Sequence, residues 1–388
     1  MLSQHALKEI LELTRESGGS FVILEKDEPR LVISDFNFYE ELVNRAQNLS
    51  KTALPNTSAE NTVPARNHYF ITGGKGALGA RLVKDLSEQG HQITDADTLS
   101  VDLLDEGALN EVFDKNNFDA VIHLAGSYGR RNSLDSPELY FVNNVEGGIN
   151  LLKMMAKYGV GKMVYQSTSL SGTPCDAAKM VYEQILSFYH KAFNISSVSL
   201  RIPFLASINE ADNNSADKIY DSPLEAIIYT AGGVISCLPV PSFTDDPDGA
   251  SNIEILSTDD AVRSIIFALN LLHTSSGSMI YKVDGLSLNL NSLIQEVMEV
   301  TGKMIPTTFS PDINISDSPT DGAATLTSIG WPGPSKKLSD IISELWDGFR
   351  STARDTSSDY AQHERNEPIS LSDLLSGKYT PFIKPHNS

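Results

Sequence analysis

The stretch that most constrains the fold is residues 68–94, HYFITGGKGALGARLVKDLSEQGHQIT. Residues 68–72 are apolar and β-favouring, which predicts a strand, and residues 80–90 have the apolar spacing of an amphipathic helix. Three glycines lie between them at intervals of three, namely Gly73, Gly76 and Gly79. A strand that turns at once into a helix through such a loop is typical of the first βα unit of a doubly wound parallel sheet of the Rossmann type, an α/β fold.

The same loop predicts a phosphate-binding site. Without side chains at Gly73 and Gly76, the backbone can approach a pyrophosphate closely, while Gly79 lets the helix pack close to the strand. The N–H groups at the start of the helix, around Ala77 and Leu78, donate to an anion and place the positive end of the helix dipole beside it. The alternative is a glycine turn that binds no ligand.

A second strand, HQITDAD at residues 91–97, ends in an acid. We expect Asp97 to accept a hydrogen bond from a ribose hydroxyl, and its charge would repel the 2′-phosphate of NADP. The sequence therefore predicts NAD as the cofactor.

The balance of charge excludes several classes of partner. Thirty basic and 50 acidic residues give a net charge of −20, which disfavours nucleic acid and anionic membrane surfaces. We identify no apolar stretch long enough to span a membrane, no signal peptide, and no His or Cys cluster with the spacing of metal ligands. Two cysteines are too few for a disulfide framework. We expect a cytoplasmic protein with a small-molecule substrate, no metal, and no nucleic-acid or membrane partner.

Composition and pattern divide the chain into four regions. These are a small α-β-β-α module at residues 1–48, a polar linker at 49–66, the main domain with a smaller C-terminal substrate lobe at 67–350, and a flexible tail at 351–388. Within the module we predict helices over 2–17 and 38–46 and a hairpin of strands 21–26 and 30–35. The module and the tail are the candidate surfaces for a protein partner.

Several segments resemble the extended short-chain dehydrogenase/reductases, the NAD-dependent epimerase/dehydratase group that contains UDP-galactose 4-epimerase. They are TGGKGALG (72–79), Asp102-Leu103, DAVIHLAG (119–126), YFVNNVEGG (140–148) and IGWPGP (329–334). The resemblance covers nearly all of residues 67–350. It implies hydride transfer between NAD and a nucleotide sugar or related hydroxy/keto compound, and a homodimer formed through the helices at 136–158 and 175–193.

The resemblance also assigns cofactor-binding residues. Asp102 and Leu103 stand where the family contacts adenine, and the strand ending with Leu124, Ala125 and Gly126 passes beside the cofactor. Asn144 belongs to the Asn-Val pair that supports the active site. His123 lies at the end of the same strand, where we expect a hydrogen-bonded structural role.

The active site departs from the family pattern at its tyrosine. The family uses Ser or Thr, Tyr and Lys, with Tyr and Lys four residues apart on one helix. Thr168 fits the hydroxyl position, and Lys179, which also holds the nicotinamide ribose, fits the lysine, but Cys175 stands where the tyrosine belongs. Either Cys175 carries protons, with a pKa lowered by Lys179 and the helix start, or it is a small apolar filler at a lost catalytic position.

Other residues bear on the same question. Tyr182 and Tyr128 are alternative phenols, of which Tyr182 is expected to pack inward. Phe204 replaces an asparagine that contacts the sugar nucleotide in many relatives, and the arginine often found near Ile253 is absent. The candidates to replace that positive charge are Arg130, Arg131 and Arg201.

Two main functions stay open from the sequence. One is an epimerase, dehydratase or reductase with an unusual proton carrier. The alternative is a catalytically silent NAD-binding scaffold or sensor. A reaction that needs no tyrosine base, such as carbonyl reduction, is a third possibility.

Overall fold

The computed structural model describes residues 20–25, 28–34, 66–127, 129–170, 172–207, 221–240, 252–309 and 323–360. The chain divides into two compact units, Met1–Pro64 and Ala65–Ser388, and the division falls within the predicted linker.

In the first unit the described residues form the predicted hairpin. Strands β1 (Ser20–Glu25) and β2 (Glu28–Ser34) are antiparallel, with Ser20 opposite Ser34. The register shifts where Leu24 pairs with Pro29, which has no N–H to donate to the ladder. The predicted helices at 2–17 and 38–46 lie outside the described residues, and so does the linker up to residue 65.

In the second unit, six described strands form a parallel sheet in the order β11-β7-β6-β5-β3-β4. Their bounds are β3 His68–Thr72, β4 Gln92–Asp95, β5 Ala120–His123, β6 Lys162–Thr168, β7 Ser196–Ile202 and β11 Ser278–Lys282. The chain runs from β3 outward to β4 and then returns to β5 on the other side of β3. The order of the strands therefore reverses beside β3, which is where such sheets bind ligands.

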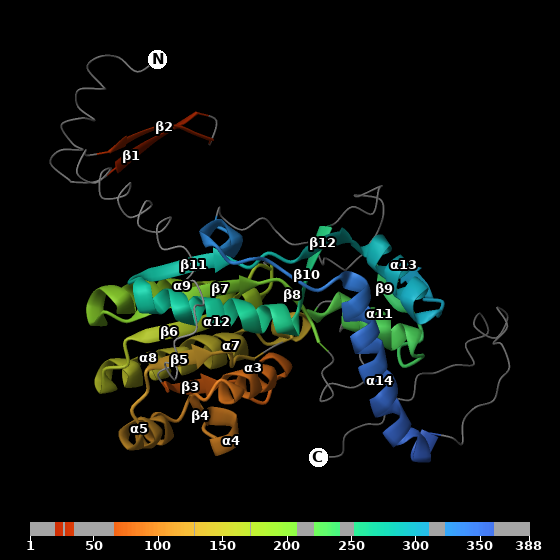
Figure 1. Ribbon diagram of the computed structural model, residues 1–388, viewed down its shortest axis with the longest axis horizontal. Coiled ribbons are helices and arrows are strands. Elements are labelled where there is room, and N and C mark those ends of the chain that lie inside the picture. The colour runs from red at the N-terminus through yellow and green to blue at the C-terminus, as the bar shows by residue number, and fades with distance from the viewer. Residues whose placement is uncertain are drawn as a thin grey trace, which may run out of the picture. The chain divides into compact units, whose positions relative to one another are not determined.

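Helices cover both faces of this sheet (Figure 1). On one face, α3 (Ala77–Glu88) and α12 (Thr258–Thr274) bury Leu82 and Ile265 against Ile71. On the other, α5 (Glu106–Lys115), α8 (Gly147–Tyr158) and α9 (Pro174–Phe193) pack against Phe70. Since neighbouring residues of a strand point to opposite faces, this arrangement confirms the doubly wound α/β fold.

The C-terminal part forms a smaller lobe with its own core. Strands β8 (Phe204–Ala206), β10 (Asn252–Ser257) and β12 (Leu286–Asn289) make one sheet, and β9 (Leu238–Val240) pairs with β13 (Thr307–Phe309). Helices α11 (Pro223–Ala231), α13 (Leu290–Thr301) and α14 (Leu338–Tyr360) pack together on them. Helix α14 continues ten residues beyond the predicted domain end at 350, so this part of the predicted flexible tail is helical. Residues 361–388 lie outside the described part of the chain.

The remaining elements are short. They are α4 (Ala96–Leu99), α6 (Arg130–Asp135), α7 (Pro137–Phe141), a π-helical turn at Val142–Glu146 and a 3₁₀ turn at Leu326–Ile329. Within the ranges that the structure describes, none of the helices has both the length and the apolar character that crossing a membrane requires.

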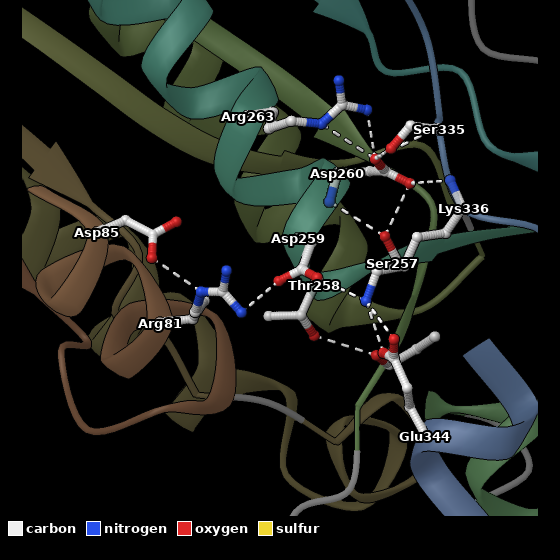
Figure 2. A network of polar contacts seen from close by, with 11 residues as sticks. Arg81, Asp85, Ser257, Thr258, Asp259, Asp260, Arg263, Ser335, Lys336 and Glu344 are labelled. Atoms are coloured by element: carbon white, nitrogen blue, oxygen red, sulfur yellow. Dashed lines mark hydrogen bonds and ion pairs between the residues drawn. The ribbon is translucent and has the colours of Figure 1, made fainter. Parts of the chain in front are cut away.

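A network of ion pairs ties the glycine-loop helix to the smaller lobe (Figure 2). Arg81 on α3 contacts Asp259 at the start of α12 at 2.6 Å, and Asp259 also contacts Lys336 at 2.6 Å. Lys336 in turn pairs with Glu344 on α14 at 2.6 Å. Helix α3 is thus joined to helix α14 through Asp259 on α12 and Lys336 in the segment before α14.

Candidate active site

A cavity of about 290 Å³ opens at the carboxyl ends of strands β3, β5, β6 and β7. It is lined by nine of the residues predicted from the sequence, Gly73, Gly76, Ala77, Leu78, Gly79, Leu124, Thr168, Cys175 and Lys179. The fold therefore places the glycine loop and the three candidate catalytic residues in one site.

Two of the three glycines are required by the protein itself. Gly73 has a φ of +80°, and a Cβ there would lie 2.7 Å from the backbone nitrogen of Ala125. A Cβ at Gly79 would overlap the carbonyl oxygen of Gly73, because α3 starts directly against the loop. These glycines let strand, loop and helix approach one another.

Gly76 differs from its two neighbours in the motif. Its φ of −66° is open to any residue, and the atom nearest to a Cβ there is the Gly73 oxygen at 3.4 Å. It caps α3 without a side-chain hydrogen bond, and the first turn of that helix carries no acidic residue. The start of α3 therefore offers N–H groups to an anion in the cavity, and the loop fits the pyrophosphate of NAD.

Asp97, which we predicted at the end of the second strand, lies in a short helix instead. Strand β4 ends at Asp95, two residues early, because the Asp95 carboxylate caps α4 by accepting from the N–H groups of Asp97 and Thr98. Asp97 is thus in the first turn of α4, and its carboxylate accepts from the N–H of Lys75 at 2.9 Å. A Cβ at Gly74 would overlap the Asp95 carboxylate, so a side chain there would displace the cap of α4, a role that sequence reasoning did not single out. The predicted bond from Asp97 to ribose stays a prediction.

The other predicted cofactor residues surround the loop after β5 and the turn before α5. The Asn144 side chain accepts from the N–H of Ser127 at 2.6 Å, and a Cβ at Gly126 would lie 3.1 Å from its oxygen. The N–H of Ala125 donates to the Thr72 hydroxyl at 3.2 Å. Asp102 accepts from the N–H of Leu104, and the Leu103 carbonyl accepts from the Asn150 amide. Their predicted contact with adenine stays a prediction. Asn144 therefore shapes the loop after β5, and its predicted role in supporting the active site stays a prediction.

His123 has a structural role. Its ring is buried, and Nδ1 lies 2.7 Å from the Thr72 hydroxyl. Burial, with a smaller contribution from the Lys179 charge, lowers the pKa of His123 to about 3. The ring is neutral at physiological pH and fixes the end of β5 against β3, which agrees with the expected role.

Cys175 is buried beside the loop after β5, with Sγ 3.6 Å from the carbonyl oxygen of Ser127. Burial raises the pKa of the Cys175 thiol to about 11, and this outweighs the opposing effect of the Lys179 charge. The direction is opposite to that expected for an activated thiolate. At neutral pH the thiol keeps its proton.

Lys179 and the hydroxyls of β6 face the same cavity. Lys179 is buried, its ammonium donates to the Gln166 carbonyl at 3.2 Å, and burial lowers its pKa. The Thr168 hydroxyl accepts from the N–H of Leu170 at 3.0 Å, which leaves its own proton to donate to a ligand. Ser167 also lines the cavity, with a buried hydroxyl that has no hydrogen-bond partner among the described residues. The sequence signal for Ser167 was its place next to Thr168 at the strand end.

Several residues were candidates to replace the tyrosine or the missing arginine. Of these, the described arginines form ion pairs with acidic residues, and Tyr182 is packed in the core. Arg201 pairs with Glu183 at 2.7 Å and Arg130 with Asp176 at 3.1 Å, and all four side chains are buried. Tyr182 packs inward as expected and donates to the Gly148 carbonyl at 2.9 Å. Phe204 is in the core of the smaller lobe. Tyr128 and the side chain of Arg131 lie outside the described part of the chain.

Comparison with known proteins gives the same family as the resemblance found in the sequence. UDP-glucose 4-epimerase of Bacillus subtilis (strain 168) is 27% identical over 326 residues, which cover 71% of this chain and 95% of that protein. UDP-glucose 4-epimerase of Yersinia enterocolitica is 27% identical over 333 residues, covering 71% of this chain and 96% of that protein.

Solved structures agree on the fold. The NAD complex of Thermus thermophilus UDP-glucose 4-epimerase superposes with a TM-score of 0.60 at 21% identity, covering 73% of this chain and 99% of that one. The Stenotrophomonas maltophila enzyme gives a TM-score of 0.63 at 19% identity, covering 75% and 100%.

The family assignment rests on the main domain. Residues 69–283, more than half of the chain, match the family described as NAD dependent epimerase/dehydratase. NAD is the cofactor of this family, in agreement with the glycine loop and its open position at Gly76. The chain belongs to the NAD dependent epimerase/dehydratase family.

Proposed function

We propose that this protein binds NAD and transfers hydride between the cofactor and a carbon of a sugar or related hydroxy/keto compound. The observation that carries the proposal is that a single cavity contains the open position at Gly76 together with Thr168 and Lys179. Bound NAD supplies the carbon that accepts or donates hydride.

The residues of the chain have distinct roles in this proposal. The N–H groups at the start of α3 bind the pyrophosphate, and the Lys179 ammonium binds the nicotinamide ribose. The Thr168 hydroxyl oxygen already accepts a hydrogen bond from the N–H of Leu170, and its own proton is available to a ligand. We assign it to donate that proton in a hydrogen bond to the reacting oxygen of the substrate. The neutral Cys175 thiol is better suited to donate a proton than to remove one, which favours carbonyl reduction over alcohol oxidation.

The relatives suggest where to look for the substrate. Those compared above are named UDP-glucose 4-epimerases, and the Thermotoga maritima structure holds UDP-glucose. Nucleotide sugars are therefore the first compounds to test, in a cytoplasmic, homodimeric protein. The exposed apolar side chains Val181, Phe188 and Phe193 on α9 support the predicted dimer face.

One observation favours a second function, a silent NAD-binding scaffold or sensor. Cys175 lies four residues before Lys179, where the resemblance expects a phenol, and burial raises the pKa of its thiol to about 11. A protein with this site still binds NAD through the loop and Lys179.

Two measurements separate these functions. The first is mass spectrometry of nucleotide released from the denatured protein, in which we expect NAD and, for an enzyme, a copurifying substrate. The second is turnover of Cys175→Tyr, with Cys175→Ser as the matched control. Since a positioned acid–base group contributes about 10²–10⁴-fold, we expect Cys175→Tyr to raise the rate of NADH formation or consumption at least tenfold. No gain with any substrate tested would favour the silent scaffold.

A further inference from the structure

A second cavity, of about 460 Å³, lies beside the first. The two cavities share two lining residues, Ala77 and Ser207. Ala77 is the first residue of α3, where we propose that the pyrophosphate of NAD binds, and Ser207 follows strand β8 of the smaller lobe. The contacts around the second cavity therefore set how the cofactor-binding helix lies relative to the lobe that forms one side of the first cavity.

Asp259, the second residue of α12, joins the two sides of the second cavity (Figure 2). Its carboxylate contacts the Arg81 guanidinium of α3 at 2.6 Å and the Lys336 ammonium at 2.6 Å. Lys336 pairs in turn with Glu344 on α14. Asp85, the other partner of Arg81, is on α3 itself. Among the described residues, the pair between Arg81 and Asp259 is the one ion pair that joins α3 to another element.

The residues on either side of Asp259 hold the start of α12 to the smaller lobe. The Thr258 hydroxyl donates to the carbonyl of Ala206 on β8 at 3.1 Å. The Asp260 carboxylate is buried and accepts from the hydroxyl of Ser335 at 2.9 Å, in the segment that leads to α14. Three consecutive residues thus contact three different parts of the molecule, and Asp259 is the one that reaches the cofactor-binding helix.

Apolar packing also holds α3 near α12, since Leu82 and Ile265 belong to one core. Such packing is non-directional and does not by itself fix the orientation of the helix. The ion pairs of Asp259 do, because each joins specific atoms. The side chains of Asp259 and Arg81 are 26% and 44% exposed, and ion pairs at such positions contribute little to stability. Asp259 therefore bears on the orientation of α3 more than on folding.

We propose that Asp259 is a positioning residue, which transmits the binding of NAD at the start of α3 to β8 and α14 of the smaller lobe. The inference rests on the proposed function and adds a role outside the first cavity. Bound pyrophosphate restricts the motion of α3, and the bridge from Arg81 through Asp259 to Lys336 passes that restriction to the lobe. NAD thereby orders the side of the cavity that we propose for the substrate. Because linkage is reciprocal, a substrate that orders the lobe strengthens the binding of NAD.

Hydrogen exchange tests this inference, measured by mass spectrometry on the full-length protein with and without saturating NAD. Exchange in residues 77–88 of α3 reports NAD binding at the loop, and exchange in residues 338–349 of α14 reports its effect on the lobe. The variant is Asp259→Asn, which removes the charge and keeps the shape. The matched control is Asp85→Asn, which makes the same change at the other partner of Arg81, within α3. A third variant, Asp259→Glu, keeps the charge.

In the wild type and in Asp85→Asn, we expect NAD to slow exchange in α14 at least about fivefold, the lower end of ordinary coupling between two sites. In Asp259→Asn this slowing should disappear, while NAD still slows exchange in α3. The melting temperature of Asp259→Asn without NAD should stay near that of the wild type, because its ion pairs are partly exposed. Asp259→Glu should restore the slowing in α14.

Slowing in α14 that persists in Asp259→Asn would overturn the inference, and so would its absence from the wild type or its loss in Asp85→Asn. A lowered melting temperature of Asp259→Asn, with no slowing recovered in Asp259→Glu, would assign the residue a structural role only and would also overturn the inference. Absence of slowing in α3 of the wild type would instead defeat the proposed function, because α3 reports on the cofactor alone.

Discussion

The two halves of the cavity are built by different means. The cofactor half comprises the glycine loop at residues 73–79 and the start of α3. Its geometry is set by the backbone, because a side chain at Gly73 or Gly79 would overlap neighbouring backbone atoms. In the part that we propose for the substrate, side chains determine the geometry, namely the buried thiol of Cys175 and the carboxylates beside Arg130. A backbone loop can be preserved while the charge and chemistry beside it change. The sequence predicts that Cys175 takes the place of the family's tyrosine, and on that prediction the difference explains how a chain keeps the family's cofactor loop while the residue beside it changes.

The largest expected effect is a difference in stability between alanine variants of two glycines in the loop, Gly79 and Gly76. In Gly79→Ala the new Cβ overlaps the Gly73 carbonyl, so we expect the free energy of unfolding to fall by more than about 3 kcal/mol. In Gly76→Ala the Cβ enters the cavity, and we expect a change of less than about 1 kcal/mol. Urea unfolding of the two variants makes the comparison. Equal losses would show that Gly76 also has a structural role.

The next effect tests what the open position at Gly76 binds. Gly76→Asp places a carboxylate in the cavity beside the start of α3, where the pyrophosphate of NAD is expected. We expect NAD affinity to fall at least about 100-fold, or roughly 2.7 kcal/mol, by fluorescence titration. The melting temperature should stay near that of Gly76→Ala. Unchanged affinity in the folded variant would remove the glycine loop from the cofactor site.

What the sequence predicted well depends on local pattern. The strand at His68–Thr72 has the predicted bounds, and nine predicted residues line the cavity. These features follow from a short run of apolar, β-favouring residues and from glycine spacing, which act over a few residues. The second strand ended early because Asp95 caps a short helix, a competing local bond that periodicity does not detect.

What the sequence did not predict arises from contacts across the fold. Asp221 and Glu225 reach the cavity from the start of α11 and the residues just before it, far beyond Thr168 in the chain. The ion pair between Arg201 and Glu183 likewise joins β7 to α9, two elements that are separate in the sequence. The thiol pKa depends on burial, which outweighs the nearby lysine that sequence reasoning could identify. The charges and pKa values of the side chains around Cys175 therefore depend on contacts between distant elements, which local sequence patterns do not give.

The smallest predicted effect concerns the pH dependence of stability that Cys175 causes. Its pKa rises from the ordinary value of 9.0 to about 11 in the folded protein. Below pH 9 both states keep the proton, so its contribution to stability is constant. Between about pH 9 and 11 the unfolded chain releases the proton first, and the folded state loses stability. Over this window we expect a loss of about 2–3 kcal/mol.

Cys175→Ser isolates this contribution, because serine does not titrate in this range and the other groups are shared. The difference in unfolding free energy, wild type minus Cys175→Ser, should fall by about 2 kcal/mol between pH 8 and pH 11 in urea titrations. Cys237→Ser serves as the control for the second thiol. A difference that rises with pH would mean a lowered pKa, and Cys175 would again be a candidate proton carrier. A falling difference supports a thiol that is protonated at neutral pH and therefore suited to donate a proton rather than to remove one.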